Sequence, residues 1–142
     1  MISNNGPIVL IEDDNDDALT MQEALKDLNV GNEVVYFPNT ILAMEFLSKT
    51  NQQPFLIICD INMPFQNGLD FKRDIDNHPE LKKKCIPFIF YSTSASVKDV
   101  EKAFLQMTIQ GFFKKANSYS EILSDITAII EYWKKSKHPN CY

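Results

Sequence analysis

The chain has 142 residues, of which 44% are hydrophobic and 11% aromatic, and its formal net charge is −5. This length fits a single domain over residues 1–142, with a core over about residues 7–136 and short flexible tails. The acidic balance argues against a nucleic-acid partner, because a nucleic-acid-binding domain is usually basic. No run approaches the ~18 apolar residues of a membrane span and the start lacks a signal-peptide pattern, so we expect no membrane partner and a cytoplasmic location.

Short apolar runs alternate with segments of helical periodicity along the chain. Five strands alternating with five helices indicate an α/β fold, a doubly wound five-stranded parallel sheet with helices on both faces, of the flavodoxin-like type. In chain order the pattern predicts a strand over Pro7–Ile11, a helix over Asn15–Asn29, a strand over Glu33–Phe37, a helix over Asn39–Lys49, a strand over Phe55–Cys59, a helix over Asn67–Asn77, a strand over Ile86–Tyr91, a helix over Ser96–Met107, a strand over Ile109–Phe113 and a last helix after the capping box Ser118-Tyr119-Ser120-Glu121.

Polar residues stand at the carboxyl ends of four predicted strands. In a doubly wound sheet these ends meet at one edge, which is where open α/β sheets bind their ligands. A carboxylate that ends a buried strand needs a partner, because an unpaired buried charge is costly. The residues at this edge are the carboxylates Glu12, Asp13 and Asp60, the hydroxyls Ser92 and Thr93, and the ammonium groups of Lys114 and Lys115.

This set of side chains indicates a site for a cation and a phosphoryl group. Three carboxylates close together raise one another's pKa. A hard divalent cation that prefers oxygen ligands removes the conflict, and Mg²⁺ suits such ligands. An adjacent lysine adds positive charge, and the combination fits a dianionic phosphoryl group, whose transfer depends mainly on positioning and charge neutralisation.

Four segments carry a resemblance to a known family, and they occur in the family's order. Together they cover nearly the whole chain. The chain resembles the receiver domain of two-component response regulators, of the chemotaxis-regulator, stand-alone type. The segments are Val9–Asp13, Ile58–Pro64 with Gly68, Pro87–Thr93 and Gly111–Lys115.

The resemblance implies a phosphoryl acceptor and a metal site. Asp60 would accept a phosphoryl group from a histidine kinase or a phosphotransfer protein. Glu12, Asp13 and the backbone carbonyl of Asn62 would hold Mg²⁺ together with Asp60.

The resemblance also implies a switch that a partner protein reads. Ser92 would bond one phosphoryl oxygen and Lys115 another. Phe112 matches the family's aromatic switch position, which moves together with the hydroxyl on phosphorylation. The domain would assist its own phosphorylation and dephosphorylation in a phosphorelay, but it would be a signalling protein and not a metabolic enzyme. The resemblance does not identify the downstream protein partner, and it leaves open whether the chain forms a homodimer.

The sequence departs from the family pattern at two positions. Glu12 stands where many relatives carry aspartate, and its longer arm would reach the metal through water. Ala116 stands where many carry a proline joined by a cis bond. A cis bond before a non-proline residue costs ~2.5–4 kcal/mol, so either the Lys115–Ala116 bond is trans or the site stores strain. Within the Lys114-Lys115 pair, counting from Gly111 favours Lys115, since a strand alternates faces.

Three further acids, Asp14, Asp16 and Asp17, are interpreted as charges at a helix N-terminus, where the helix dipole favours them. Three other functions are weighed against the receiver. A phosphatase of the haloacid-dehalogenase type would need a second aspartate at position 62, which holds asparagine. A flavodoxin-like cofactor binder would need a phosphate loop after the first strand, where the acids of residues 12–14 would repel phosphate. A phosphorylation-independent binding module is disfavoured because every position of the receiver site is filled.

Overall fold

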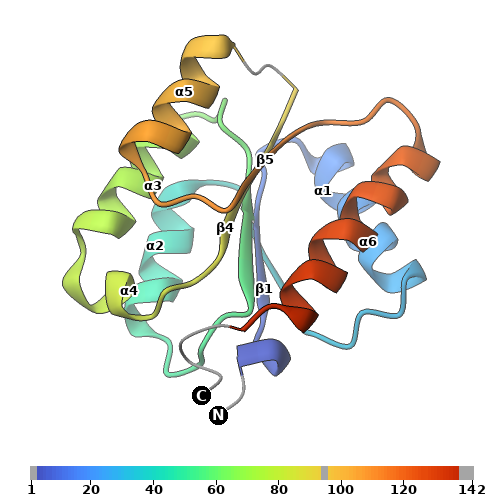
Figure 1. Cartoon of the computed structure of the whole chain (residues 1–142), viewed down its shortest axis with the longest axis horizontal. Helices are drawn as coiled ribbons and strands as arrows, with labels where there is room; N and C mark the ends of the chain where they lie inside the picture. Colours follow the sequence, from blue (N-terminus) through green and yellow to red (C-terminus); the bar gives the residue numbers. More distant parts are fainter. Residues whose placement is uncertain (1–2, 94–95, 138–142) are drawn as a thin grey trace.

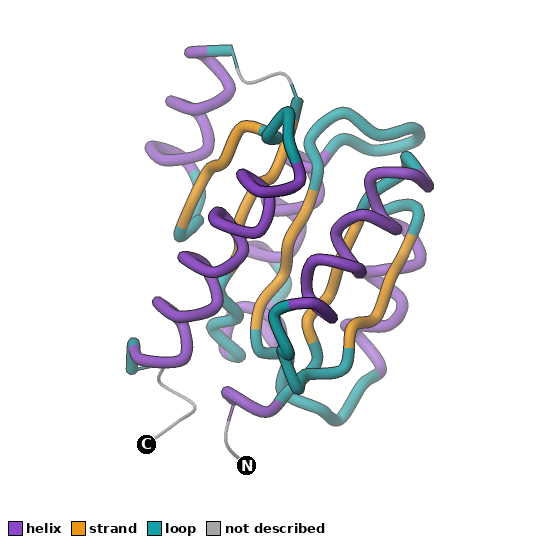
Figure 2. The backbone as a smooth tube through the Cα atoms, turned by 90° about the vertical axis from the view of Figure 1, so that its right-hand side faces the viewer, coloured by secondary structure: helices purple, strands orange, loops and turns teal. Residues whose placement is uncertain are grey.

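The computed structural model describes residues 3–93 and 96–137. They form one five-stranded parallel sheet between two layers of helices (Figure 1, Figure 2), which confirms the predicted fold class. The strand order is β2-β1-β3-β4-β5. The strands are β1 (Ile8–Ile11), β2 (Val34–Phe37), β3 (Leu56–Cys59), β4 (Phe88–Ser92) and β5 (Gly111–Lys114).

The helices divide between the two faces of the sheet. In Figure 1, α1 and α6 cover one face, and α2, α3, α4 and α5 cover the other. None of the described helices combines the length and the apolar character that a membrane span requires. The helical elements are the 3₁₀-helix η1 (Ser3–Asn5), α1 (Asn15–Asp27), α2 (Thr40–Lys49), α3 (Gly68–Asn77), α4 (Pro79–Lys83), α5 (Val97–Gln106) and α6 (Tyr119–Lys135).

The predicted elements agree with these bounds to within a few residues, with three differences. The 3₁₀-helix η1 and the short helix α4 were not predicted, because three and five residues are too few to show helical periodicity. Strand β5 begins at Gly111, two residues later than predicted. The backbone before it is drawn toward α3, because Thr108 N and Oγ1 both donate to the carboxylate of Asp76.

The sheet separates two hydrophobic clusters. One lies between the sheet and α2, α3, α4 and α5, and the other lies under α1 and α6. Every residue of β1, β3 and β4 is buried, whereas the edge strands β2 and β5 are mostly half-buried. Burial on both faces explains why the central strands read as continuous apolar runs. The carboxyl ends of the central strands are therefore anchored in the packed core.

Candidate functional site

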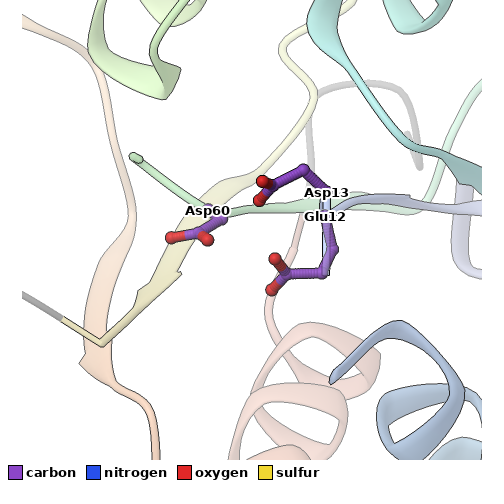
Figure 3. Close-up of side chains that lie close together, drawn as sticks. All are labelled: Glu12, Asp13 and Asp60. Atoms are coloured by element: carbon purple, nitrogen blue, oxygen red, sulfur yellow. The ribbon is translucent and has the colours of Figure 1, made fainter. Parts of the chain in front are cut away.

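The carboxyl ends of β1 and β3 bring three acids together. Ile11 pairs with Cys59 in the sheet, and Asp60 N donates to Ile11 O at 3.0 Å. The residues after these strands, Glu12, Asp13 and Asp60, each offer a carboxylate oxygen, and these oxygens lie within 4.8 Å of one another (Figure 3). Glu12 and Asp60 are each 5% exposed, and Asp13 is exposed. One side of this acid cluster is therefore buried and the other is open to solvent.

The loop after β3 fixes the position of Asp60. Asp60 Oδ1 accepts a hydrogen bond from Ile61 N at 2.7 Å. Gly68, the first residue of α3, donates its N–H to Ile61 O at 2.8 Å. A Cβ on Gly68 would lie 2.2 Å from the carbonyl oxygen of Asp60, so this close approach requires glycine. Asn62 lies in the same loop, two residues after Asp60, with its side chain exposed.

Lys115 brings a positive charge to the acid cluster. It follows β5, and its backbone N–H donates to Ser92 O at 2.8 Å. Its Nζ lies 3.3 Å from Asp60 Oδ2 and 2.9 Å from Asp17 Oδ2, and it also forms an ion pair with Glu12. The neighbouring Lys114 is exposed. The structure thus places Lys115, and not Lys114, among the carboxylates.

Asp17 is the residue of this site that the sequence analysis did not identify. It was interpreted only as a charge at a helix N-terminus. That interpretation fits the backbone, because Asp14 is the N-cap of α1 and its side chain accepts hydrogen bonds from Asp16 N and Asp17 N. The carboxylate of Asp17, however, points toward Lys115 across the cleft. No local pattern in the sequence indicates this contact, because Asp17 and Lys115 are 98 residues apart in the chain.

Burial and charge shift the pKa values of two groups in the site. Burial raises the pKa of Glu12 to about 8, the bond to Lys115 opposes the rise, and the charge of Asp60 adds to it. Burial disfavours the charged form of Lys115, but its bonds to Glu12 and Asp17 outweigh this effect and raise the pKa of Lys115 above its usual value. Three carboxylates, those of Glu12, Asp17 and Asp60, share one ammonium group, and Asp13 adds a fourth carboxylate, so the site has a surplus of negative charge. Three oxygen donors in this arrangement fit a hard divalent cation.

Glu12, Asp17, Asp60 and Lys115 line a cleft of about 620 Å³ that opens to solvent. Thr93 and Asn117 lie along it beside Asp60 and Lys115. Its inner wall, which includes Met21, is partly apolar. A small charged group can therefore reach the carboxylate of Asp60 from solvent.

Ser92 and Phe112 are not part of the cleft lining, whereas Thr93 is. Ser92 is fully buried, and its Oγ has no hydrogen-bond partner among the described residues. Strand alternation places its side chain on the same face as Phe90. The Phe90 ring packs against the half-buried Phe112 ring, with 5.6 Å between centroids. The structure therefore brings Ser92 and Phe112 to one face, without a bond from Ser92 to Asp60.

The backbone after Lys115 answers a question that the sequence left open. No peptide bond among the described residues is cis, so the Lys115–Ala116 bond is trans. This agrees with the high cost of a cis bond before a residue other than proline. Ala116 N donates to the hydroxyl of Tyr91 at 3.3 Å, which ties this loop to β4.

Comparison with known proteins identifies the family. The model of the response regulator receiver domain matches residues 8–127. The chain belongs to the response regulator receiver family. Receiver domains of this family are signalling modules, and this agrees with the expectation that the chain is not a metabolic enzyme.

Similar proteins include cyanobacterial receivers. Response regulator Rcp1 from Synechocystis sp. is 26% identical over 131 residues, which cover 89% of this chain and 87% of that protein. The structure of the phosphorylated cyanobacterial phytochrome response regulator RcpA is 28% identical, with a TM-score of 0.82, and the match covers 93% of this chain and 96% of RcpA. The Mn²⁺-bound structure of Rcp1 is 25% identical, with a TM-score of 0.79 and the same coverage of 93% and 96%.

Proposed function

We propose that this receiver accepts a phosphoryl group on Asp60 from a histidine kinase or a phosphotransfer protein, in a reaction that requires Mg²⁺. The observation that carries the proposal is the cluster of three carboxylates within 4.8 Å of one another, with Lys115 beside it. The phosphorylated state of RcpA and the Mn²⁺-bound state of Rcp1 support it by analogy. A downstream protein would read the resulting change in the receiver's surface.

In this proposal Asp60 both accepts the phosphoryl group and helps to hold the metal, and the other two acids of the cluster help to hold the metal. Asp60 is the nucleophile, and one of its carboxylate oxygens attacks the phosphorus of the donor. A new P–O bond forms while the bond to the donor breaks, and the leaving group keeps the electron pair. Glu12, Asp13 and the backbone carbonyl of Asn62 would hold Mg²⁺ together with Asp60. When bound, Mg²⁺ would neutralise the charge that develops on the transferred group.

Lys115 orients the acceptor before transfer and the phosphoryl group after it. Its Nζ lies 3.3 Å from Asp60 Oδ2, while Asp60 Oδ1 is held by Ile61 N at 2.7 Å. The carboxylate of Asp60 is thus fixed at both oxygens, which lowers the cost of reaching the reactive geometry. After transfer, the ammonium group pairs with a phosphoryl oxygen, in a charge-assisted hydrogen bond.

Phosphorylation changes the surface through Ser92 and Phe112. A buried hydroxyl without a hydrogen-bond partner is costly, and a phosphoryl oxygen on Asp60 would supply a partner for Ser92. Movement of Ser92 toward the phosphoryl group alters the packing at the end of β4, where the rings of Phe90 and Phe112 are in contact. Phe112 then changes position on the edge strand, where a partner protein can detect it.

Ser92→Ala should therefore be phosphorylated on Asp60 and yet show a smaller structural response. Backbone amide spectra with and without beryllofluoride, which mimics the phosphoryl group, measure that response. We expect the shifts at the end of β4 and at Phe112 to fall to less than about half, because a hydrogen bond to a charged group contributes ~1.5–3 kcal/mol. Thr93→Val is the control, since it removes the neighbouring hydroxyl that lines the cleft. A full response in Ser92→Ala together with a reduced response in Thr93→Val would show that Thr93, and not Ser92, carries the switch.

The proposed function itself is tested with a small phosphodonor. The protein is incubated with acetyl phosphate and Mg²⁺, and its intact mass is measured. We expect the mass to increase by one phosphoryl group with Mg²⁺ and to stay unchanged when EDTA removes the metal. Equal labelling with and without the metal would contradict the proposed role of the acid cluster.

A further inference from the structure

Among the described residues Lys115 has three carboxylate partners, and they belong to two different groups. An ammonium group has three N–H donors. Nζ of Lys115 is within ion-pair distance of Glu12, Asp60 and Asp17. Glu12 and Asp60 are members of the three-acid cluster, whereas Asp17 is not. Asp17 is therefore the one partner that Lys115 does not share with a bound cation.

A cation at the acid cluster would compete with Lys115 for the same two carboxylates. A divalent cation and an ammonium group held by the same carboxylates also repel each other, because both carry positive charge in a partly buried site. The Lys115 side chain is only 10% exposed, and its withdrawal from all three carboxylates would leave an ammonium group poorly solvated within the cleft. Lys115 needs a counter-ion that stays available when Glu12 and Asp60 are occupied.

We propose that Asp17 is this counter-ion and acts as a positioning residue. It holds the ammonium group of Lys115 inside the cleft while the metal occupies the acid cluster, and so keeps Lys115 within reach of the group transferred to Asp60. This inference rests on the proposed function, because it requires a metal at the acid cluster.

The position of Asp17 suits this role. Its backbone N–H donates to Asp14 Oδ1 at 3.1 Å, so the first turn of α1 fixes where its side chain begins. The side chain is 45% exposed and lines the same cleft as Asp60 and Lys115. The ammonium group of Lys115 can therefore move toward Asp17 without leaving the cleft. Asp17 and Asp60 both pair with Lys115, so the effect of Asp17 on the acceptor passes through Lys115.

The first test is the Mg²⁺ affinity of Asp17→Asn, measured by titration calorimetry with MgCl₂. Without Asp17, Lys115 competes more strongly for Glu12 and Asp60. We expect affinity about three- to fivefold weaker than wild type, the upper range for a partly exposed ion pair. Asp16→Asn is the matched control. It removes the same charge from the same helix turn, but among the described residues Asp16 is not a partner of Lys115. We expect less than about a twofold change in this control, because screening weakens the effect of a solvent-exposed charge.

The second test asks whether the effect passes through Lys115. In a Lys115→Met background, Asp17→Asn and Asp16→Asn should change Mg²⁺ affinity equally. Asp17→Glu, which keeps a carboxylate, should stay within about twofold of wild type. If Asp17→Asn matches Asp16→Asn in the wild-type background, or if its larger effect persists without Lys115, the positioning role is overturned while the proposed function stands. A wild-type protein that binds no Mg²⁺ would overturn the proposed function as well.

Discussion

Asp13→Asn should abolish Mg²⁺ binding and labelling by acetyl phosphate together. Asp13 is the exposed member of the acid cluster, so its carboxylate is the one most available to a cation arriving from solvent. Loss of a residue that only supports a metal ligand costs about 10–100-fold in affinity, and loss of a ligand should cost at least ~100-fold. Titration with MgCl₂ and intact-mass measurement after labelling test the two effects on the same samples.

Asp14→Asn is the matched control for this substitution. It removes one negative charge from the adjacent position, but asparagine is as good an N-cap as aspartate, so α1 keeps its hydrogen bonds to Asp16 N and Asp17 N. We expect Mg²⁺ affinity within about threefold of wild type, since only a screened surface charge is lost. Unchanged Mg²⁺ affinity in Asp13→Asn, or equal losses in both variants, would mean that Asp13 is not a ligand.

Gly68→Ala should destabilise the fold, although alanine is the better helix former. Helix propensity alone favours alanine by up to ~1 kcal/mol. The added Cβ would lie 2.2 Å from Asp60 O and 3.1 Å from Ile61 Cα, and both are backbone atoms that cannot swing away. We expect the clash to dominate, with a loss of ~1–3 kcal/mol in unfolding free energy. The same displacement moves the acceptor loop, so labelling of Asp60 should fall as well.

Thermal and urea unfolding measure this effect, and Gly31→Ala provides its control. A Cβ at Gly31 would meet nothing within 4 Å. We expect that variant to stay within about 0.5 kcal/mol of wild type, as is usual for surface substitutions. A Tm of Gly68→Ala at or above the wild-type value would show that the close approach of α3 to Asp60 is not required.

The sequence predicted most of the fold because burial leaves a clear pattern in the central strands. The run before Asp60 is apolar at every position, because both faces of β3 are covered. The charged residue Asp60 comes directly after this run. The same reasoning located Glu12 and Asp13, because sheet topology alone brings the ends of adjacent parallel strands together. The choice of Lys115 over Lys114 also agrees with the geometry, since strand alternation determines which side chain reaches the site.

Other features depend on contacts that no local pattern reveals. Asp17 and Lys115 are 98 residues apart, and α1 and the loop after β5 meet only in the folded chain. The burial of Ser92 follows from the rings packed on the same face of β4, whereas the sequence shows only a run of adjacent hydroxyls, Ser92, Thr93 and Ser94. Helix α4 depends on local capping by His78. The late start of β5 depends on the hydrogen bonds from Thr108 to Asp76.

The central claim, that Asp60 is the phosphoryl acceptor, is tested most directly by locating the modification. After incubation with acetyl phosphate and Mg²⁺, borohydride reduces an aspartyl phosphate and marks the modified position for peptide mass spectrometry. We expect the mark at Asp60 in wild type and no labelling in Asp60→Asn. A mark on a different carboxylate, or labelling of Asp60→Asn as strong as that of wild type, would contradict this account.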